Sequence, residues 1–309
     1  MREIARFRRC KVKTITLLLI VTIAGFAARE AINCPGMPIH IALAADSNHR
    51  RGLLALMNSI YRNTMCPKLL VFHLFDSSPL PSFSKARIIQ HAPHHKSKLL
   101  RFVNQQYNEL QFPRGNLKAS ENYMRYLLAE ILNDVEACWW LDADIVVQGD
   151  LYKLTRKLDI YYARSKAILA AIPRKRKGFT VEAFLRLKSL GIAVQYPAVT
   201  FNAGILYLNL DSWRKKNVTS TLAAIALVNE HEALWNDSGS QPPLQLAVGD
   251  DFDPVPATLL DRLGYKPGIT VSDAAMFLHW NGKHKPWLSS GKYASYWDAY
   301  AMEEPTTRG

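Results

Sequence analysis

Two aspartates separated by one residue follow an apolar stretch near the middle of the chain. The segment 139–141 (WWL) precedes Asp142 and Asp144, and the segment 145–147 (IVV) follows them. A carboxylate between apolar residues is costly to bury without a partner, and a divalent cation such as Mg²⁺ or Mn²⁺ suits two carboxylates. A turn in which the aspartates cap backbone groups is the alternative for an isolated Asp-x-Asp. The apolar flanks favour the metal.

A second polar segment, 279–287 (HWNGKHKPW), follows the apolar run 274–278. His279 is a candidate third metal ligand, and a mixed histidine and carboxylate site favours Mn²⁺ over Mg²⁺. Gly282 permits close approach of the backbone to a ligand, and Lys285 offers a point charge for a phosphate. A lone histidine is more often a core residue, so the interpretation depends on the glycine, lysines and tryptophans around His279.

A third polar segment, Ala45-Asp46-Ser-Asn48, follows the first apolar run of the chain. Asp46 can accept hydrogen bonds from a nucleobase N–H or a ribose hydroxyl, and Asn48 can donate or accept. A turn that caps the following helix is the alternative.

Alternating strands and helices must position these three segments. The predicted strands are Ile39–Ala45, Leu69–Phe75, Ala86–Gln90, Glu136–Leu141, Ile168–Ile172 and Phe201–Leu208. The predicted helices are one through Leu53–Ile60, one over Ser120–Leu132 and a mostly helical stretch over Asp211–His231. This alternation predicts an α/β fold with a mostly parallel sheet. Ligands of such sheets bind beyond the carboxyl ends of the strands, where the polar segments fall.

Composition and charge exclude several classes of protein. The 309 residues are 49% hydrophobic and 21% charged, which argues against a disordered, collagen-like or coiled-coil chain. The 39 basic and 26 acidic residues give a net charge of +13, but no helix-turn-helix, zinc-finger or RNP pattern accompanies it, so we expect no nucleic-acid partner. Cys138 lies in an apolar strand and is expected to be a buried thiol; Cys34 and Cys66 could pair or stay reduced.

The N-terminus carries the signals for a cellular compartment. Residues 1–13 are basic and residues 14–28 are uncharged and apolar, which predicts a signal anchor or, alternatively, a cleaved signal peptide. We expect a short stem over 29–35, a catalytic domain over 36–300 and a flexible tail over 301–309. The sequons at Asn217 and Asn236 favour a luminal body in the ER or Golgi, or a secreted one if the segment is cleaved.

Taken together, the motifs resemble the retaining sugar-nucleotide glycosyltransferases of family eight. The segments that carry the resemblance are AADSN (44–48), NYMRYLLAEIL (122–132), WLDADIVVQGDL (140–151), FNAGILYLNLDSWRKKNVT (201–219) and LHWNGKHKPW (278–287). An Asp-x-Asp alone is unspecific, but its combination with FNAG and HWNGxxKPW is highly specific. The resemblance implies a GT-A, Rossmann-like fold and is strongest to the animal glycosyltransferase-8-domain-containing proteins.

The resemblance also implies roles for individual residues. Asp142 and Asp144 match the Asp-x-Asp that binds Mn²⁺ and, through it, the UDP diphosphate. His279 matches the third protein ligand, and Gly282 and Lys285 match the diphosphate contacts.

On the nucleoside and sugar side, Asp46 and Asn48 match the uridine-binding turn and Arg125 matches an arginine that contacts the donor. Asn202 matches the FNAG asparagine near the donor sugar. Many bacterial members carry an acid beside the glutamine that matches Gln241, and this chain has none there. Gln241 is therefore a weaker candidate near the sugar.

These inferences predict a Mn²⁺-dependent enzyme that moves a hexose or pentose from a UDP-sugar to a glycan or glycoprotein acceptor with retention. No candidate carboxylate nucleophile stands out beyond the metal ligands, so we expect front-face attack rather than a covalent intermediate. The alternative is an inactive family member that acts as a luminal UDP-sugar or glycan-binding scaffold.

Overall fold

The computed structural model describes residues 33–46, 48–75, 100–103, 120–175, 178–235, 239–264 and 268–302. The apolar segment 14–28, the predicted strand Ala86–Gln90 and the sequon at Asn236 lie outside these ranges. Within them, no helix is long and apolar enough to cross a bilayer. The predicted limits of the stem, catalytic domain and tail stay predictions.

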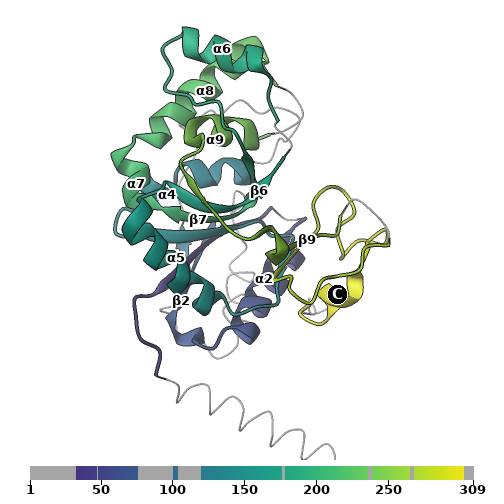
Figure 1. Ribbon diagram of the computed structural model, residues 1–309. Coiled ribbons are helices and arrows are strands. Elements are labelled where there is room, and N and C mark those ends of the chain that lie inside the picture. The colour runs from purple at the N-terminus through teal and green to yellow at the C-terminus, as the bar shows by residue number, and fades with distance from the viewer. Residues whose placement is uncertain are drawn as a thin grey trace, which may run out of the picture.

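A mixed, mostly parallel sheet of seven strands forms the centre of the fold (Figure 1). Its order is β3-β2-β1-β4-β7-β6-β8. The strands are β1 (Ile39–Ala44), β2 (Leu70–Phe75), β3 (Leu100–Val103), β4 (Ala137–Leu141), β6 (Leu169–Arg174), β7 (Thr200–Asn209) and β8 (Phe252–Pro254). Strand β7 is antiparallel to both its neighbours, whereas the remaining pairs are parallel. The expectation of a mostly parallel sheet is confirmed.

A second sheet of three short strands lies beside the first. It consists of β5 (Ile145–Val147), β10 (Phe277–His279) and β9 (Leu260–Arg262), with β10 in the middle. Strand β10 is antiparallel to β5, and His279 faces Ile145 in the register. This pairing brings the histidine next to the Asp-x-Asp turn, although His279 and Ile145 are 134 positions apart in the chain.

Helices cover both faces of the larger sheet (Figure 1). The helices α2 (Arg50–Asn63) and α5 (Leu151–Ser165) pack on one face. The opposite face is covered by α4 (Leu128–Ile131), α7 (Leu210–Lys215), α8 (Val218–Glu232) and α9 (Gln241–Val248). The remaining helices are α6 (Val181–Ser189), α10 (Ala294–Asp298) and the 3₁₀ turns Pro67–Leu69, Ser120–Tyr126 and Ala257–Leu259.

The prediction of one helix over Ser120–Leu132 is wrong. A 3₁₀ helix over Ser120–Tyr126 precedes the short α4 instead. Tyr126 accounts for the break, because its carbonyl accepts a hydrogen bond from Thr219 Oγ1 at 3.1 Å and its hydroxyl donates to the Ser240 carbonyl at 2.5 Å. The Tyr126 carbonyl thus has a tertiary partner in place of the backbone N–H that a continuous α-helix would supply. The predicted helical stretch after Asp211 is confirmed, with a break between α7 and α8.

The three cysteines in the described part of the chain fall into two classes. Cys34 and Cys66 form a disulfide, with their Cα atoms 5.8 Å apart, which ties the segment before β1 to the segment that follows α2. Cys138 lies fully buried in β4 as a free thiol, as expected. Burial raises the pKa of the Cys138 thiol far above its usual range, so this thiol is inert at neutral pH.

Candidate metal and donor-binding site

The Asp-x-Asp turn is held by hydrogen bonds from both sheets. The backbone N–H of Asp142, directly after β4, donates to the Gly204 carbonyl of β7 at 2.9 Å. The carbonyl of Asp144 accepts from the Trp280 N–H, one residue after β10, at 3.0 Å. Because both ends of the turn are fixed to neighbouring strands, the two carboxylates have defined positions relative to His279.

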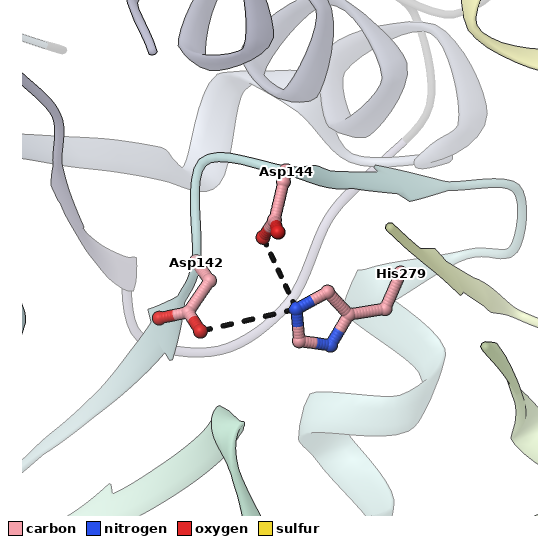
Figure 2. Close-up of side chains that lie close together, drawn as sticks. All are labelled: Asp142, Asp144 and His279. Atoms are coloured by element: carbon pink, nitrogen blue, oxygen red, sulfur yellow. Dashed lines mark ion pairs between the residues drawn. The ribbon is translucent and has the colours of Figure 1, made fainter. Parts of the chain in front are cut away.

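Asp142, Asp144 and His279 point toward one another, as Figure 2 shows. His279 Nε2 lies 3.1 Å from Asp144 Oδ1 and 3.9 Å from Asp142 Oδ2. One ligand atom from each of the three residues lies within 4.8 Å of the other two. The set offers two carboxylate oxygens and one imidazole nitrogen at a largely buried position, which fits a divalent transition metal such as Mn²⁺.

Asp144 is the most buried carboxylate of this cluster. Burial by itself raises the pKa of this carboxyl, but the charge and hydrogen bond of His279 and of Lys285 outweigh it, so the pKa lies well below its usual range. Lys285 Nζ contacts Asp144 Oδ2 directly and also donates to the Trp280 carbonyl at 3.0 Å. Asp144 is therefore an anion at neutral pH, available as a metal ligand.

Arg125, which is predicted to contact the sugar donor, lies against Asp142 of the cluster. Its side chain is only 3% exposed, and its guanidinium donates to Asp142 Oδ1 at 3.2 Å and contacts the Ala203 carbonyl. The structure thus places Arg125 against a predicted metal ligand. Its contact with a donor stays a prediction.

The two residues predicted near the donor sugar have different surroundings. Asn202 is buried on β7, and its Oδ1 accepts from the Gly204 N–H at 2.8 Å. Gln241 begins α9, and its Oε1 accepts from Arg174 at the end of β6 at 3.0 Å. Asn202 therefore lies beside the metal cluster, while Gln241 is held by an arginine; their roles toward a sugar stay predictions.

The predicted uridine-binding turn lies at the same edge of the sheet, because β1 and β4 are parallel neighbours. Asp46 Oδ1 accepts from the backbone N–H groups of Asn48 and His49, each at 3.0 Å, and lies 2.6 Å from the His49 ring. Asp46 thus closes a local turn before α2 but does not cap this helix, whose N-cap residue His49 has no side-chain cap hydrogen bond. Asn48 and Gly282 are exposed, and Gly282 has a φ of +86°, which favours glycine. Nucleotide contacts by this turn stay predictions.

Two glycines of the site were not predicted from the sequence. A Cβ on Gly204 would lie 2.5 Å from both Asp142 Oδ2 and His279 Cε1, so only glycine leaves room for the two ligands. A Cβ on Gly52 of α2 would overlap the Ala143 carbonyl inside the Asp-x-Asp turn. A glycine inside a strand such as β7 signals the close approach of another group, and this signal could have identified Gly204.

The fold of the chain is similar to that of glycosyltransferases of known structure. The galactosyltransferase LgtC, solved with donor and acceptor sugar analogs, aligns with a TM-score of 0.62 and 16% identity over 87% of this chain and 98% of its own. The bifunctional glycosyltransferase WbbM aligns with a TM-score of 0.62 and 17% identity over 87% of this chain; the match spans 50% of WbbM. The fold is therefore that of the GT-A glycosyltransferases.

The family follows from the sequence match. The family model described as glycosyl transferase family 8 matches residues 40–291. Mouse glycosyltransferase 8 domain-containing protein 2 is 26% identical over 298 residues, covering 86% of this chain and 83% of the mouse protein. The chain belongs to glycosyl transferase family 8 and is a glycosyltransferase.

Proposed function

We propose that the protein transfers a hexose or pentose from a UDP-sugar to a glycan or glycoprotein acceptor, with Mn²⁺ as its metal. The observation that carries the proposal is the convergence of Asp142, Asp144 and His279 at the carboxyl edge of the sheet. Lys285 lies in direct contact with this cluster and adds a positive charge to it. An anionic diphosphate and a divalent cation are the ligands that such a mixed set of charges suits.

The residues of the site have different roles in the release of a nucleoside diphosphate. A divalent cation bound by the cluster would stabilise the negative charge that develops on the leaving diphosphate. Lys285, already placed beside Asp144, moves its ammonium onto a diphosphate oxygen and adds to this stabilisation. Arg125 pairs with Asp142 and holds its carboxylate in place.

Transfer proceeds with retention in this proposal, by attack on the face that the diphosphate leaves. A departing phosphate oxygen takes the proton of the acceptor hydroxyl, so that no enzyme carboxylate forms a bond to the sugar. Both aspartates of the cluster would be occupied as metal ligands, and Asp142 is also paired with Arg125 and Asp144 with His279. Trapping of a covalent glycosyl-enzyme would overturn this mechanism.

Calorimetry with UDP tests the donor site. We expect the purified protein to bind UDP with Mn²⁺ present and to lose most of that binding in EDTA, because the diphosphate and the carboxylates repel one another without a cation. Metal-dependent UDP binding followed by turnover of UDP-glucose, UDP-galactose or UDP-xylose would support the proposal. Metal-dependent binding without turnover of any donor would instead favour a UDP-sugar-binding scaffold. Absence of UDP binding to folded protein would contradict the transferase and leave the glycan-binding scaffold.

We further propose that the catalytic part lies in the lumen of the ER or Golgi, attached through residues 14–28. The disulfide between Cys34 and Cys66 supports this location, because disulfides persist in oxidising compartments. Asn217 of the first sequon also supports it, since this residue is exposed at the turn before α8, where its φ is +53°. Strand β7 starts at the edge of the sheet where Asp142 lies and ends at the opposite edge, shortly before Asn217. A glycan on Asn217 would therefore leave the metal cluster accessible.

An Asn217→Gln variant tests this location. We expect the wild-type protein expressed in animal cells to lose apparent mass on treatment with a glycosidase specific for N-glycans, and the variant to lose less by one glycan. Thr219→Ser is the matched control, because it keeps the sequon and a hydroxyl for the contact with Tyr126. Equal mobility of wild type and Asn217→Gln, before and after treatment, would contradict glycosylation at this site.

A further inference from the structure

The two carboxylate oxygens of Asp142 have different neighbours. Oδ1 accepts hydrogen bonds from the Trp140 indole Nε1 at 3.0 Å and from the Arg125 guanidinium at 3.2 Å. Oδ2 lies 3.9 Å from His279 Nε2 and 2.5 Å from the place a Cβ on Gly204 would occupy. Oδ1 therefore accepts hydrogen bonds from other side chains, whereas Oδ2 faces His279, another candidate metal ligand.

The two donors to Oδ1 support each other. Trp140 is 1% exposed on β4, and the Arg125 guanidinium carbon lies 4.7 Å from the centroid of its ring. Arg125 is itself 3% exposed and is fixed by contact with the Ala203 carbonyl of β7. A desolvated cation over a tryptophan face is held firmly, so the two groups act as one rigid clamp on Oδ1.

We propose that Trp140 is a positioning residue of the metal site, which holds Asp142 so that Oδ2 alone is offered to the cation. The proposal rests on the proposed metal dependence of the enzyme. Its physical basis is that Trp140 and Arg125 occupy Oδ1, so Oδ2 would be the oxygen of Asp142 left to hold a cation. Hydrogen-bonding partners behind a ligand also fix its orientation and raise the affinity for the metal.

The variant Trp140→Phe removes the indole N–H while keeping an aromatic face under Arg125. Trp139→Phe is a matched control, because Trp139 is equally buried, points to the other face of β4 and donates its own indole N–H to Thr155 Oγ1 at 2.9 Å. Each variant loses one buried tryptophan hydrogen bond, so each loses stability in the same way. Only Trp140→Phe alters a contact to a candidate metal ligand.

Titration with Mn²⁺ tests the role of Trp140. The full-length protein and both variants are titrated, and binding is measured by calorimetry and by the EPR signal of free Mn²⁺. We expect Trp140→Phe to weaken Mn²⁺ binding about ten- to hundredfold, and Trp139→Phe to leave the Kd within about twofold, as for an independent site. The melting temperatures of both variants measure how much stability each loses, separately from its affinity for Mn²⁺.

The outcomes separate this inference from the proposed function. Equal Mn²⁺ affinities of Trp140→Phe and Trp139→Phe would overturn the clamp while metal binding by the wild type stands. If the wild type binds no Mn²⁺, the proposed metal site and the clamp fail together. If Trp140→Phe does not fold, Arg125→Lys takes its place, because it keeps the charge over the Trp140 ring and loses the fork that reaches Oδ1; an unchanged Kd for this variant would overturn the clamp.

Discussion

Replacing Asp144 by asparagine is expected to abolish detectable Mn²⁺ binding and to lower kcat/KM about a thousandfold, the upper range for loss of one preorganised group that stabilises charge in the transition state. The change is isosteric, but it removes the anion that faces His279 Nε2 at 3.1 Å and contacts Lys285. A neutral amide binds a divalent cation weakly, and it leaves the positive charge of Lys285 without its carboxylate. Calorimetry with Mn²⁺ and initial rates with a UDP-sugar measure the two effects.

Asp273→Asn is the control for this change, because it removes the same charge from an exposed position outside the cluster. We expect this control to retain the Mn²⁺ affinity and rate of the wild type. A folded Asp144→Asn protein, as judged by circular dichroism, that still binds Mn²⁺ with the affinity of the control would exclude Asp144 as a ligand.

The long strands were predictable because each is a continuous apolar run. The segment Ile39–Ala44 (IHIALA) is buried except for His40 and pairs in parallel on both sides, as expected for a central strand. The three-residue strands β5, β9 and β10 gave no such signal, because three residues carry no periodicity. Yet the pairing of β5 with β10 is what places His279 beside the aspartates.

The helix error has a similar origin. The segment over Ser120–Leu132 is apolar enough for a helix, and sequence periodicity alone did not distinguish an α-helix from a 3₁₀ turn. The outcome depended on the hydrogen bond that the Tyr126 carbonyl accepts from Thr219 and on the one that the Tyr126 hydroxyl donates to the Ser240 carbonyl, and both partners are distant in the chain. Tertiary contacts decided the local structure here.

The site was predictable in its ligands and much less in what holds them. The residue types of Asp142, Asp144 and His279, with apolar flanks, indicated a metal, and the structure brings these three side chains together. The positions of Arg125 and Gly204 relative to Asp142 depend on the register of β4 against β7. The sequence of either strand alone does not contain that register.

Gly204→Ala should be nearly as damaging to metal binding as loss of a ligand. The glycine is buried in β7, and a methyl group there would lie 2.5 Å from Asp142 Oδ2 and 2.5 Å from His279 Cε1. Asp142 cannot simply rotate away, because Trp140 and Arg125 hold its other oxygen. We expect Mn²⁺ affinity to fall about a hundredfold, the upper range for changes beside a metal ligand, and transfer activity to fall with it.

Gly191→Ala separates the effect on the ligands from a general loss of stability. Gly191 has a φ of +74° and open space where a Cβ would be, so alanine there strains the backbone without touching any neighbour. This control should lower the melting temperature, because the native backbone conformation is unfavourable for alanine, and leave the Kd for Mn²⁺ unchanged. If Gly204→Ala folds and binds Mn²⁺ as tightly as Gly191→Ala, then the cation does not bind between Asp142 and His279, and the ligand set assigned to this enzyme is wrong.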